Sequence, residues 1–249
     1  MSATDIADKN GRNGAEEQFA FDRPTSFKSL TAAVASALQN DLVTGRYLPG
    51  AKLPIVKLAR DYGVSPGAVR EALSRLVSEN LVEFNEQRGF RAAPVSRAAL
   101  FDIARTRVRV DAHALRDAIR LGDVDWEADV LVIHHRLANC PERDDQSLGM
   151  RADWQRLHRI FHRTLIAACG SEWLIRFHDL LYDQMIRYRS LAGAYQLDLR
   201  RNVRSEHGAI VDAVIARDAD AAAAAIEKHY MTTANLLAEV TALRDEPPG

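Results

Sequence analysis

The fold of this chain is decided by the stretch Leu53-Pro-Ile-Val-Lys-Leu-Ala-Arg-Asp-Tyr-Gly-Val-Ser-Pro-Gly-Ala-Val-Arg-Glu-Ala-Leu-Ser-Arg-Leu76. Its spacing predicts two short helices joined by a tight turn. Gly63 suits the left-handed conformation that ends a helix, and Ser65 can accept a hydrogen bond from a backbone N–H at the start of the second helix. Pro66 then falls in the first helical turn, where a missing N–H costs nothing. We therefore expect a helix-turn-helix here.

The second helix of this pair has one apolar face and one polar face. The apolar face repeats at helical spacing and comprises Val69, Leu73 and Leu76. The opposite face, which we expect to be exposed, comprises Gly67, Ala68, Arg70, Glu71, Ser74 and Arg75. A helix-turn-helix presents such a face to the major groove of DNA.

A β-hairpin is predicted directly after the helix pair. Residues 81–84 alternate like a short strand, residues 85–89 form a polar turn, and residues 90–94 return. With Arg88 and Gly89 at its tip, this hairpin has the character of a wing that enters the minor groove. The alternative is a purely structural helix pair and hairpin, which also occurs in enzymes. Helix, turn, helix and wing in this order within one short segment favour DNA binding.

Charge is distributed unevenly along the chain. Residues 25–97 hold ten Lys or Arg and six Asp or Glu, a balance of +4, whereas the whole chain carries −1, so the remainder carries −5. The positive charge coincides with the predicted DNA-binding segment, as neutralisation of phosphates requires. Simple solvation is the alternative for Lys57 and Arg75. The candidate DNA contacts are Lys57, Ser65, Gly67, Arg70, Arg75, Arg88 and Gly89.

The sequence predicts a tail and two domains. Residues 1–24 are polar and are expected to be a disordered tail. Residues 25–95 form the winged helix-turn-helix domain, which begins with an amphipathic helix from about Leu30 to Gly45, and residues 96–245 form an all-α helical bundle. The overall fold class is therefore mainly α, with a small β-hairpin wing. Six helices are predicted in the bundle, over 96–121, 125–139, 150–168, 171–191, 198–216 and 218–243.

Composition is that of an ordinary globular chain. With 249 residues, of which 47% are hydrophobic, the chain can build two separate cores. It contains no apolar run of about 18 residues, so no membrane partner is expected. The N-terminus lacks the pattern of a secretory signal, and Cys140 and Cys169 make no disulfide framework. These features predict a cytoplasmic protein.

Two histidines stand out in the helix predicted over 150–168. His158 and His162 are four residues apart and share a face, and the apolar residues around them indicate that much of this helix is buried. Two neighbouring imidazoles cannot both be protonated cheaply in a low-dielectric interior, and a divalent cation that takes their neutral lone pairs resolves this conflict. The alternative is two separately hydrogen-bonded histidines, and the spacing alone leaves both interpretations open.

A family resemblance extends these predictions for residues 28–95. The run from Leu42 to Leu53, followed by Gly63-Val-Ser, by Val69-Arg-Glu-Ala-Leu73 and by Gly89-Phe-Arg91, resembles the N-terminal domain of GntR-type bacterial transcription regulators. The resemblance implies operator DNA as the partner, and it matches Arg70 to an arginine that related regulators use at the operator. The family commonly has another arginine where this chain has Pro66, so no operator sequence carries over from relatives.

The helical region resembles the FCD ligand-binding domain of the FadR subfamily. The resemblance rests on residues 107–111, 158–162, 205–210 and 228–230. In many FCD domains a metal is held by an Asp, a His four residues later and two further His. This implies His162, His207 and His229 as ligands, with His158 at the position of the usual Asp. An all-imidazole site favours zinc, or nickel, over a hard cation. The alternatives are a capped surface group for His207 and a packing role for His229.

If a metal is bound with open positions, the natural effector is a small carboxylate, which would give an oxygen to the cation and a negative charge to an arginine. Arg107 is the first candidate to bind it, because the family often places an arginine at this point, and Arg187 and Arg189 follow. Each of the three could instead be a solvent-facing charge. Asp111 is included in this effector-binding set, and it is, with Glu206, a candidate partner of the ligand histidines. Residues 122–131, 169–174 and 186–189 resemble repressors of glutarate and GABA catabolism, which makes a dicarboxylate a reasonable expectation.

The sequence as a whole predicts a transcriptional regulator, and specifically a repressor that binds its operator as a homodimer. Effector binding in the helical domain would shift the dimer away from the operator-binding arrangement. Two alternatives are a metal-dependent hydrolase and a DNA-binding protein with a purely structural metal. The chain has no His-Glu-x-x-His motif to supply a general base, which argues against the hydrolase.

Overall fold

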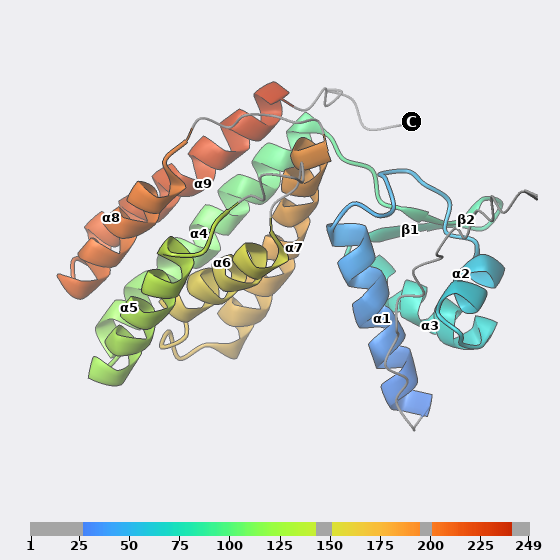
Figure 1. Ribbon diagram of the computed structural model, residues 1–249, viewed down its shortest axis with the longest axis horizontal. Helices are drawn as coiled ribbons and strands as arrows, with labels where there is room; N and C mark the ends of the chain where they lie inside the picture. The colour runs from blue at the N-terminus through green and yellow to red at the C-terminus, as the bar shows by residue number, and fades with distance from the viewer. Residues whose placement is uncertain (1–26, 143–150, 195–200, 241–249) are drawn as a thin grey trace, which may run out of the picture.

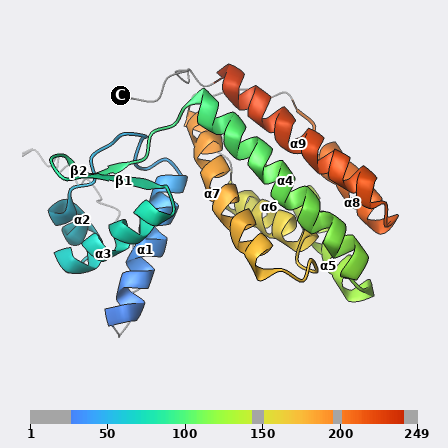
Figure 2. The same cartoon turned by 180° about the vertical axis from the view of Figure 1, so that it is seen from behind.

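The computed structural model of the protein describes residues 27–142, 151–194 and 201–240. Within these ranges the chain forms an N-terminal lobe and a bundle of long helices, which Figure 1 and Figure 2 show from opposite sides. The predicted fold class, a winged helix-turn-helix followed by an all-α bundle, is confirmed. The tail predicted over residues 1–24 lies outside the described residues.

The N-terminal lobe combines three helices with a two-stranded hairpin. The Ser65 hydroxyl accepts a hydrogen bond from the backbone N–H of Ala68 at 3.2 Å, and Gly63 has a φ of +63°, so the turn and the cap form as the sequence predicts. The strands are antiparallel, with Val82 opposite Ala92. The elements are α1 (Phe27–Val43), α2 (Ile55–Asp61), α3 (Pro66–Ser78), β1 (Val82–Asn85) and β2 (Gly89–Ala92).

One prediction for α3 is wrong. The sequence pattern places Ala68 on the exposed face of the helix, but this residue is fully buried. Both α1 and α2 pack against α3, so its buried face is wider than the predicted stripe and takes in Ala68 and Ala72. Arg70 and Arg75 stay exposed on the opposite side.

The described part of the bundle contains six helices, as predicted. The first begins after Ser96, whose hydroxyl accepts a hydrogen bond from the N–H of Ala99 at 3.1 Å, and ends before Gly122. The predicted helix ends at residues 150, 198 and 243 lie outside the described residues. The helices are α4 (Arg97–Leu121), α5 (Val124–Ala138), α6 (Ala152–Leu165), α7 (Glu172–Ala194), α8 (Val203–Ile215) and α9 (Ala219–Val240).

Helix α4 is central to the bundle, and helix α7 connects the bundle to the N-terminal lobe. Helix α4 packs against α7 and α9, while α5 packs against α6 and α8 against α9 (Figure 1). The bundle has its own hydrophobic core, which includes Leu115 and Phe161. The core of the N-terminal lobe also includes Tyr182 and Ile186 from α7, so this helix is packed into both lobes. Among the described helices, none combines the length and apolarity that crossing a membrane requires.

Candidate metal centre and nucleic-acid surface

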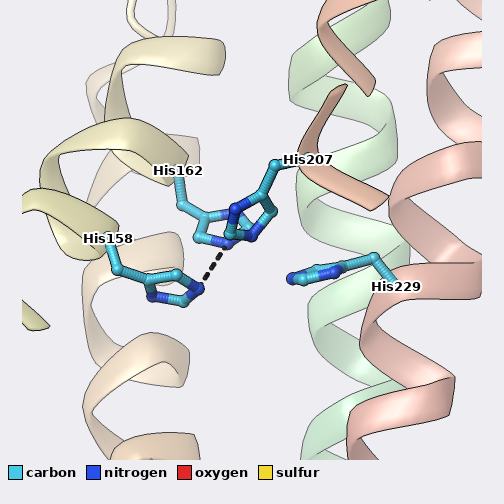
Figure 3. Close-up of side chains that lie close together, drawn as sticks. All are labelled: His158, His162, His207 and His229. Carbon is cyan, nitrogen blue, oxygen red and sulfur yellow. Dashed lines mark hydrogen bonds between the residues drawn. The ribbon is translucent and has the colours of Figure 1, made fainter. Parts of the chain in front are cut away.

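Four buried histidines converge inside the bundle. Figure 3 shows His158 and His162 from α6 facing His207 from α8 and His229 from α9. Each of these residues is no more than 3% exposed, and each offers one nitrogen such that all four atoms lie within 4.8 Å of one another. Three helices from different parts of the chain therefore bring four imidazoles to one point.

The helices bring these rings together because each histidine lies on a buried helix face. On α6, Trp154, His158, Phe161, His162 and Leu165 are buried, which is one helical stripe. His207 lies in the first half of α8 and His229 near the middle of α9, and these two helices pack against each other. The alternative of His207 as a surface group is therefore excluded by its burial.

The outward-facing ring nitrogens are held by polar partners. Nδ1 of His158 lies 2.8 Å from the Tyr182 hydroxyl, and Nδ1 of His229 lies 2.8 Å from a carboxylate oxygen of Glu206. Nδ1 of His162 lies 3.3 Å from the Tyr230 hydroxyl. Hydrogen bonding at Nδ1 leaves Nε2 of each ring available as a metal ligand, which is the usual arrangement around a protein-bound metal.

The inward-facing nitrogens fit a metal ion. Nε2 of His158 and Nε2 of His162 are 3.1 Å apart, and Nε2 of His207 is buried without a hydrogen-bond partner in the described part of the chain. A buried polar atom without a partner costs free energy unless something unseen satisfies it. Four imidazoles are a donor set that suits zinc or nickel. The cluster could therefore bind a divalent metal.

Burial makes these histidines neutral bases. It lowers the pKa of His158, His162 and His207 well below the ordinary 6.5, because the interior penalises the charged form. Burial also lowers the pKa of His229 to about 4, against the opposing effect of its hydrogen bond to Glu206. Neutral imidazoles keep the lone pairs that a metal needs.

Glu206 keeps its charge beside the cluster. Burial on its own raises a carboxyl pKa, but hydrogen bonds from Arg201 and His229 outweigh this and lower the pKa of Glu206 to about 2. A carboxylate on the far nitrogen of a ligand histidine orients the ring and raises its basicity. The prediction that Glu206 partners a ligand histidine therefore agrees with its position.

Arg107 is buried next to the cluster. Its side chain is 5% exposed, its guanidinium carbon lies 3.9 Å from the centre of the Tyr230 ring, and its Nε lies 3.4 Å from Asp111. Neither Nε nor Nη2 has a hydrogen-bond partner among the described residues. Arg107 is thus a buried cation with donors to spare, as a residue that binds an anion requires.

Asp111 faces Arg107 rather than the four histidines. Its carboxylate accepts hydrogen bonds from His178 Nδ1 at 3.0 Å and from the Tyr230 hydroxyl at 2.6 Å. Burial raises the pKa of a carboxyl group, but the charge and hydrogen bond of His178 outweigh this, and the pKa of Asp111 is lowered. Asp111 is thus placed to hold Arg107 and Tyr230 in position.

The two remaining effector candidates lie in different places. Nη1 of Arg189 lies 3.3 Å from Nε2 of His158, so this arginine reaches the cluster. Arg187, by contrast, is buried and donates hydrogen bonds to the carbonyl of Ala93 and to Gln184. The structure therefore brings Arg189 to the site and does not bring Arg187 there.

A small cavity adjoins the cluster between α4, α6, α7 and α9. Its volume is about 10 Å³, which is close to the minimum that holds one water. A carboxylate can enter only if side chains such as Arg189 move. The lining residues are Arg107, His158, Met185, Arg189, His229, Tyr230 and Thr233.

Three residues of this centre were missed by the sequence reasoning. His178, Tyr182 and Arg201 carry no motif that marks them, and only the packing of α7 and of the segment before α8 brings them to the site. Tyr182 follows His178 by four residues on α7, so the two share a helix face, which is the only sequence signal available.

The candidate DNA contacts lie on α2, on α3 and its N-cap, and on the hairpin. Lys57, Arg70 and Arg88 are exposed, as are Ser65 and Gly67, while Gly89 is partly buried with a φ of +71°. Arg75 is exposed and forms an ion pair with Glu79 at 3.2 Å. The polar face of α3 is therefore exposed, while its opposite face is buried in the core.

The chain resembles known bacterial regulators over most of its length. The model of the family described as bacterial regulatory proteins, gntR family, matches residues 30–91, and the model of the FCD domain matches residues 102–232. The uncharacterised HTH-type transcriptional regulator BphR of Paraburkholderia xenovorans (strain LB400) is 38% identical, covering 93% of this chain and 96% of the relative. The HTH-type transcriptional repressor GlaR of Escherichia coli (strain K12) is 33% identical, covering 82% and 94%. Among solved structures, E. coli McbR/YncC has a TM-score of 0.72 at 22% identity, covering 87% of this chain and 99% of that one, which shows a shared fold.

The buried histidines predict acid sensitivity in the metal-free protein. Because their pKa values are lower in the folded than in the unfolded chain, the unfolded chain binds more protons below pH 6.5 and the free energy of unfolding falls with pH toward about 4. The slope is about 1.4 kcal/mol per pH unit for each proton. Urea denaturation in chelator at pH 7.5, 6.0 and 5.0 measures it.

His229→Gln should reduce the slope of the free energy of unfolding against pH by the contribution of about one proton. The exposed His113 lies outside the cluster and supplies the control, because His113→Gln should keep the slope that the four buried rings produce. A wild-type free energy of unfolding that stays constant between pH 7.5 and 5.0 would contradict the burial of neutral imidazoles.

Proposed function

The chain belongs to the GntR family of bacterial regulatory proteins and carries an FCD domain, and from this premise we propose that it is a repressor whose operator affinity depends on a bound metal and a small carboxylate. Residues 25–95 bind the operator, and residues 96–245 bind the metal and the effector. The observation that carries this proposal is the convergence of four buried imidazoles with one buried arginine that has unused donors.

Zinc is the metal that we propose, with nickel as the alternative. All four ligands are neutral nitrogens, and this donor set disfavours magnesium or calcium, which prefer oxygen. The His158, His162, His207 and His229 rings would hold the ion, and Tyr182, Tyr230 and Glu206 would orient three of them. Bound there, the ion supplies a positive centre that can accept an oxygen ligand.

The effector that suits such a centre is a small carboxylate. Four neutral ligands leave the charge of a divalent ion uncompensated, and Arg189 adds a positive charge at the same cavity. Arg107, whose charge is paired with Asp111, lines this cavity with an Nη2 group that has no hydrogen-bond partner among the described residues. Arg189 now approaches Nε2 of His158, and it needs another acceptor when that nitrogen binds a metal. A carboxylate meets this need, and a dicarboxylate could engage the metal and an arginine together.

Operator recognition is assigned to the polar face of α3 and to the hairpin. Arg70 is the principal contact to a base or a phosphate, and Ser65 and Gly67 lie close enough in sequence to contact backbone or thymine methyl groups. Arg88 and Gly89 at the hairpin tip suit the minor groove, and Lys57 and Arg75 add phosphate contacts. We propose a homodimer, because one recognition helix reads too few base pairs for useful affinity.

The first test concerns the metal ligands. His207→Gln removes one nitrogen donor without adding charge, and zinc affinity should fall by more than about 100-fold, because loss of an orienting partner alone costs 10–100-fold. Competition with a chromogenic chelator measures this affinity, and elemental analysis of the wild type should give one zinc per protomer. His113→Gln, on an exposed ring, should bind zinc like the wild type. Equal zinc affinity in His207→Gln and the wild type would refute the ligand set.

The second test concerns DNA recognition. Arg70→Ala should weaken binding to a duplex selected by the wild type from a random-sequence pool by about 10-fold or more, the loss expected for one specific arginine contact. Because Arg70 is exposed, the melting temperature should not change. Arg116→Ala, which removes an exposed arginine from the bundle, is the matched control. Undiminished affinity in Arg70→Ala would remove Arg70 from the interface.

The third test concerns the effector. With zinc-loaded protein, succinate or glutarate should lower affinity for the selected duplex by at least about fivefold, and acetate should act more weakly. Arg107→Gln should abolish this response while leaving affinity in the absence of acid unchanged. If every acid leaves DNA affinity unaltered, the metal has a structural role and carboxylate sensing is wrong.

A further inference from the structure

Helix α7 is where the bundle meets the N-terminal lobe. Side-chain hydrogen bonds of this helix join the two lobes. The Gln39 amide donates to the Asp183 carboxylate, the Gln184 amide donates to the carbonyl of Glu79, and Arg187 donates to the carbonyl of Ala93. Figure 1 shows α7 as the bundle helix that faces α1. The same segment of α7 borders the imidazole cluster.

Tyr182 contacts both the cluster and the core of the DNA-binding lobe. Its hydroxyl lies 2.8 Å from Nδ1 of His158, while its ring belongs to the hydrophobic core formed by α1, α2 and α3. The residue is 2% exposed, and Ile186, one turn later, packs into the same core. One side chain therefore connects a candidate metal ligand to the packing of the DNA-binding lobe.

Asp183 provides a second connection beside the first. Its carboxylate accepts a hydrogen bond from Gln39 of α1 at 2.7 Å and forms an ion pair with Arg159, the residue that follows His158 on α6. The Arg159 guanidinium carbon also lies 5.0 Å from the centre of the Tyr182 ring. Helix α6, which carries two of the four imidazoles, is thus tied to α1 through Asp183.

These contacts restrict how the two lobes can move independently. If a metal ion is bound to Nε2 of His158, a shift of that ion moves the ring. The ring then either loses its hydrogen bond to Tyr182 or displaces the Tyr182 side chain. Displacement of Tyr182 would disturb a close-packed core. Such a core switches between discrete packing arrangements and does not deform continuously. The orientation of the DNA-binding lobe should therefore depend on whether a metal ion is bound to His158.

We propose that Tyr182 is a positioning residue that couples occupancy of the imidazole cluster to the placement of the DNA-binding lobe, with Asp183 and Gln39 as a supporting contact. This inference rests on the proposed metal site, and it adds the route by which that site affects operator affinity. Coupling between two sites is reciprocal, so bound zinc should change the affinity for the operator by the same factor by which bound operator changes the affinity for zinc.

The test measures that coupling factor in full-length protein. Affinity for the selected duplex is determined with zinc-saturated and with chelator-stripped protein, and zinc affinity is determined with and without duplex. In the wild type both ratios should be equal and at least about fivefold. In Tyr182→Phe, which keeps the ring and removes the hydroxyl, both ratios should fall to below about twofold, whatever happens to zinc affinity itself.

Tyr230→Phe is the matched control. It removes a buried tyrosine hydroxyl from another candidate ligand, His162, but Tyr230 belongs to the bundle core and makes no part of the core of the DNA-binding lobe. Zinc affinity should fall in this variant while the coupling factor stays at the wild-type value. Asp183→Asn is the second test variant, and it should lower the coupling factor with zinc affinity in the absence of DNA unchanged, since Asp183 contacts no ligand histidine.

The outcomes separate this proposal from the proposed function. A wild-type coupling factor of at least about fivefold that persists in Tyr182→Phe and Asp183→Asn would overturn the route and leave metal-dependent regulation intact. A wild-type coupling factor of one would instead remove metal-dependent operator binding, and this proposal with it. Loss of coupling in Tyr230→Phe to the same degree as in Tyr182→Phe would show a general effect on the cluster and would also overturn the route.

Discussion

Burying four imidazoles at one point of a helical bundle is the constraint on which the rest of this structure depends. A buried polar nitrogen costs free energy unless it has a partner, and a buried imidazolium costs more. The bundle meets this cost on the outer side of the rings, where Tyr182, Tyr230 and Glu206 hold three of the Nδ1 atoms. On the inner side, Nε2 of His207 has no protein partner among the described residues, so the described chain leaves this nitrogen unsatisfied, and a cation bound there would satisfy it.

The charges around this centre indicate what a bound metal would attract. The carboxylate of Asp111 balances the charge of Arg107, and that of Glu206 balances the charge of Arg201. Arg189 instead contacts Nε2 of His158, and a metal ion bound to that nitrogen would displace it. A divalent ion with neutral ligands and a displaced arginine favour an anion at the same cavity. The relatives are named as transcriptional regulators, and the proposed ligand binding without turnover is the chemistry that suits such a protein. Helix α7 is packed into both lobes and contacts α1, so in the proposed coupling it would transmit the effect of ligand binding to the DNA-binding lobe.

Much of this architecture could be predicted from local sequence signals, and the failures have physical causes. Gly63 ends a helix through its own backbone conformation, and Ser65 and Ser96 accept hydrogen bonds from N–H groups three residues later. These effects are local, so the turn and the caps follow from the sequence. The face of α3 that holds Ala68 depends on how many helices pack there, which local periodicity does not encode. Helix α7 is the clearest limit. Residues 182–188 are all buried, so no stripe distinguishes Arg187, which faces Ala93, from residues that face the cluster. The convergence of His207 and His229 with His158 and His162 was implied by family resemblance, because spacing covers only the pair on α6.

X-ray absorption spectroscopy at the zinc edge of the zinc-loaded protein would show whether these four imidazoles bind one metal ion. We expect about four nitrogen neighbours at roughly 2.0–2.1 Å, with the multiple scattering of several imidazole rings and room for an added oxygen neighbour. A shell dominated by sulfur, or by oxygen with fewer than two imidazoles, would contradict it. In that case the metal would lie elsewhere in the chain, and the cluster would need another explanation for its buried nitrogens.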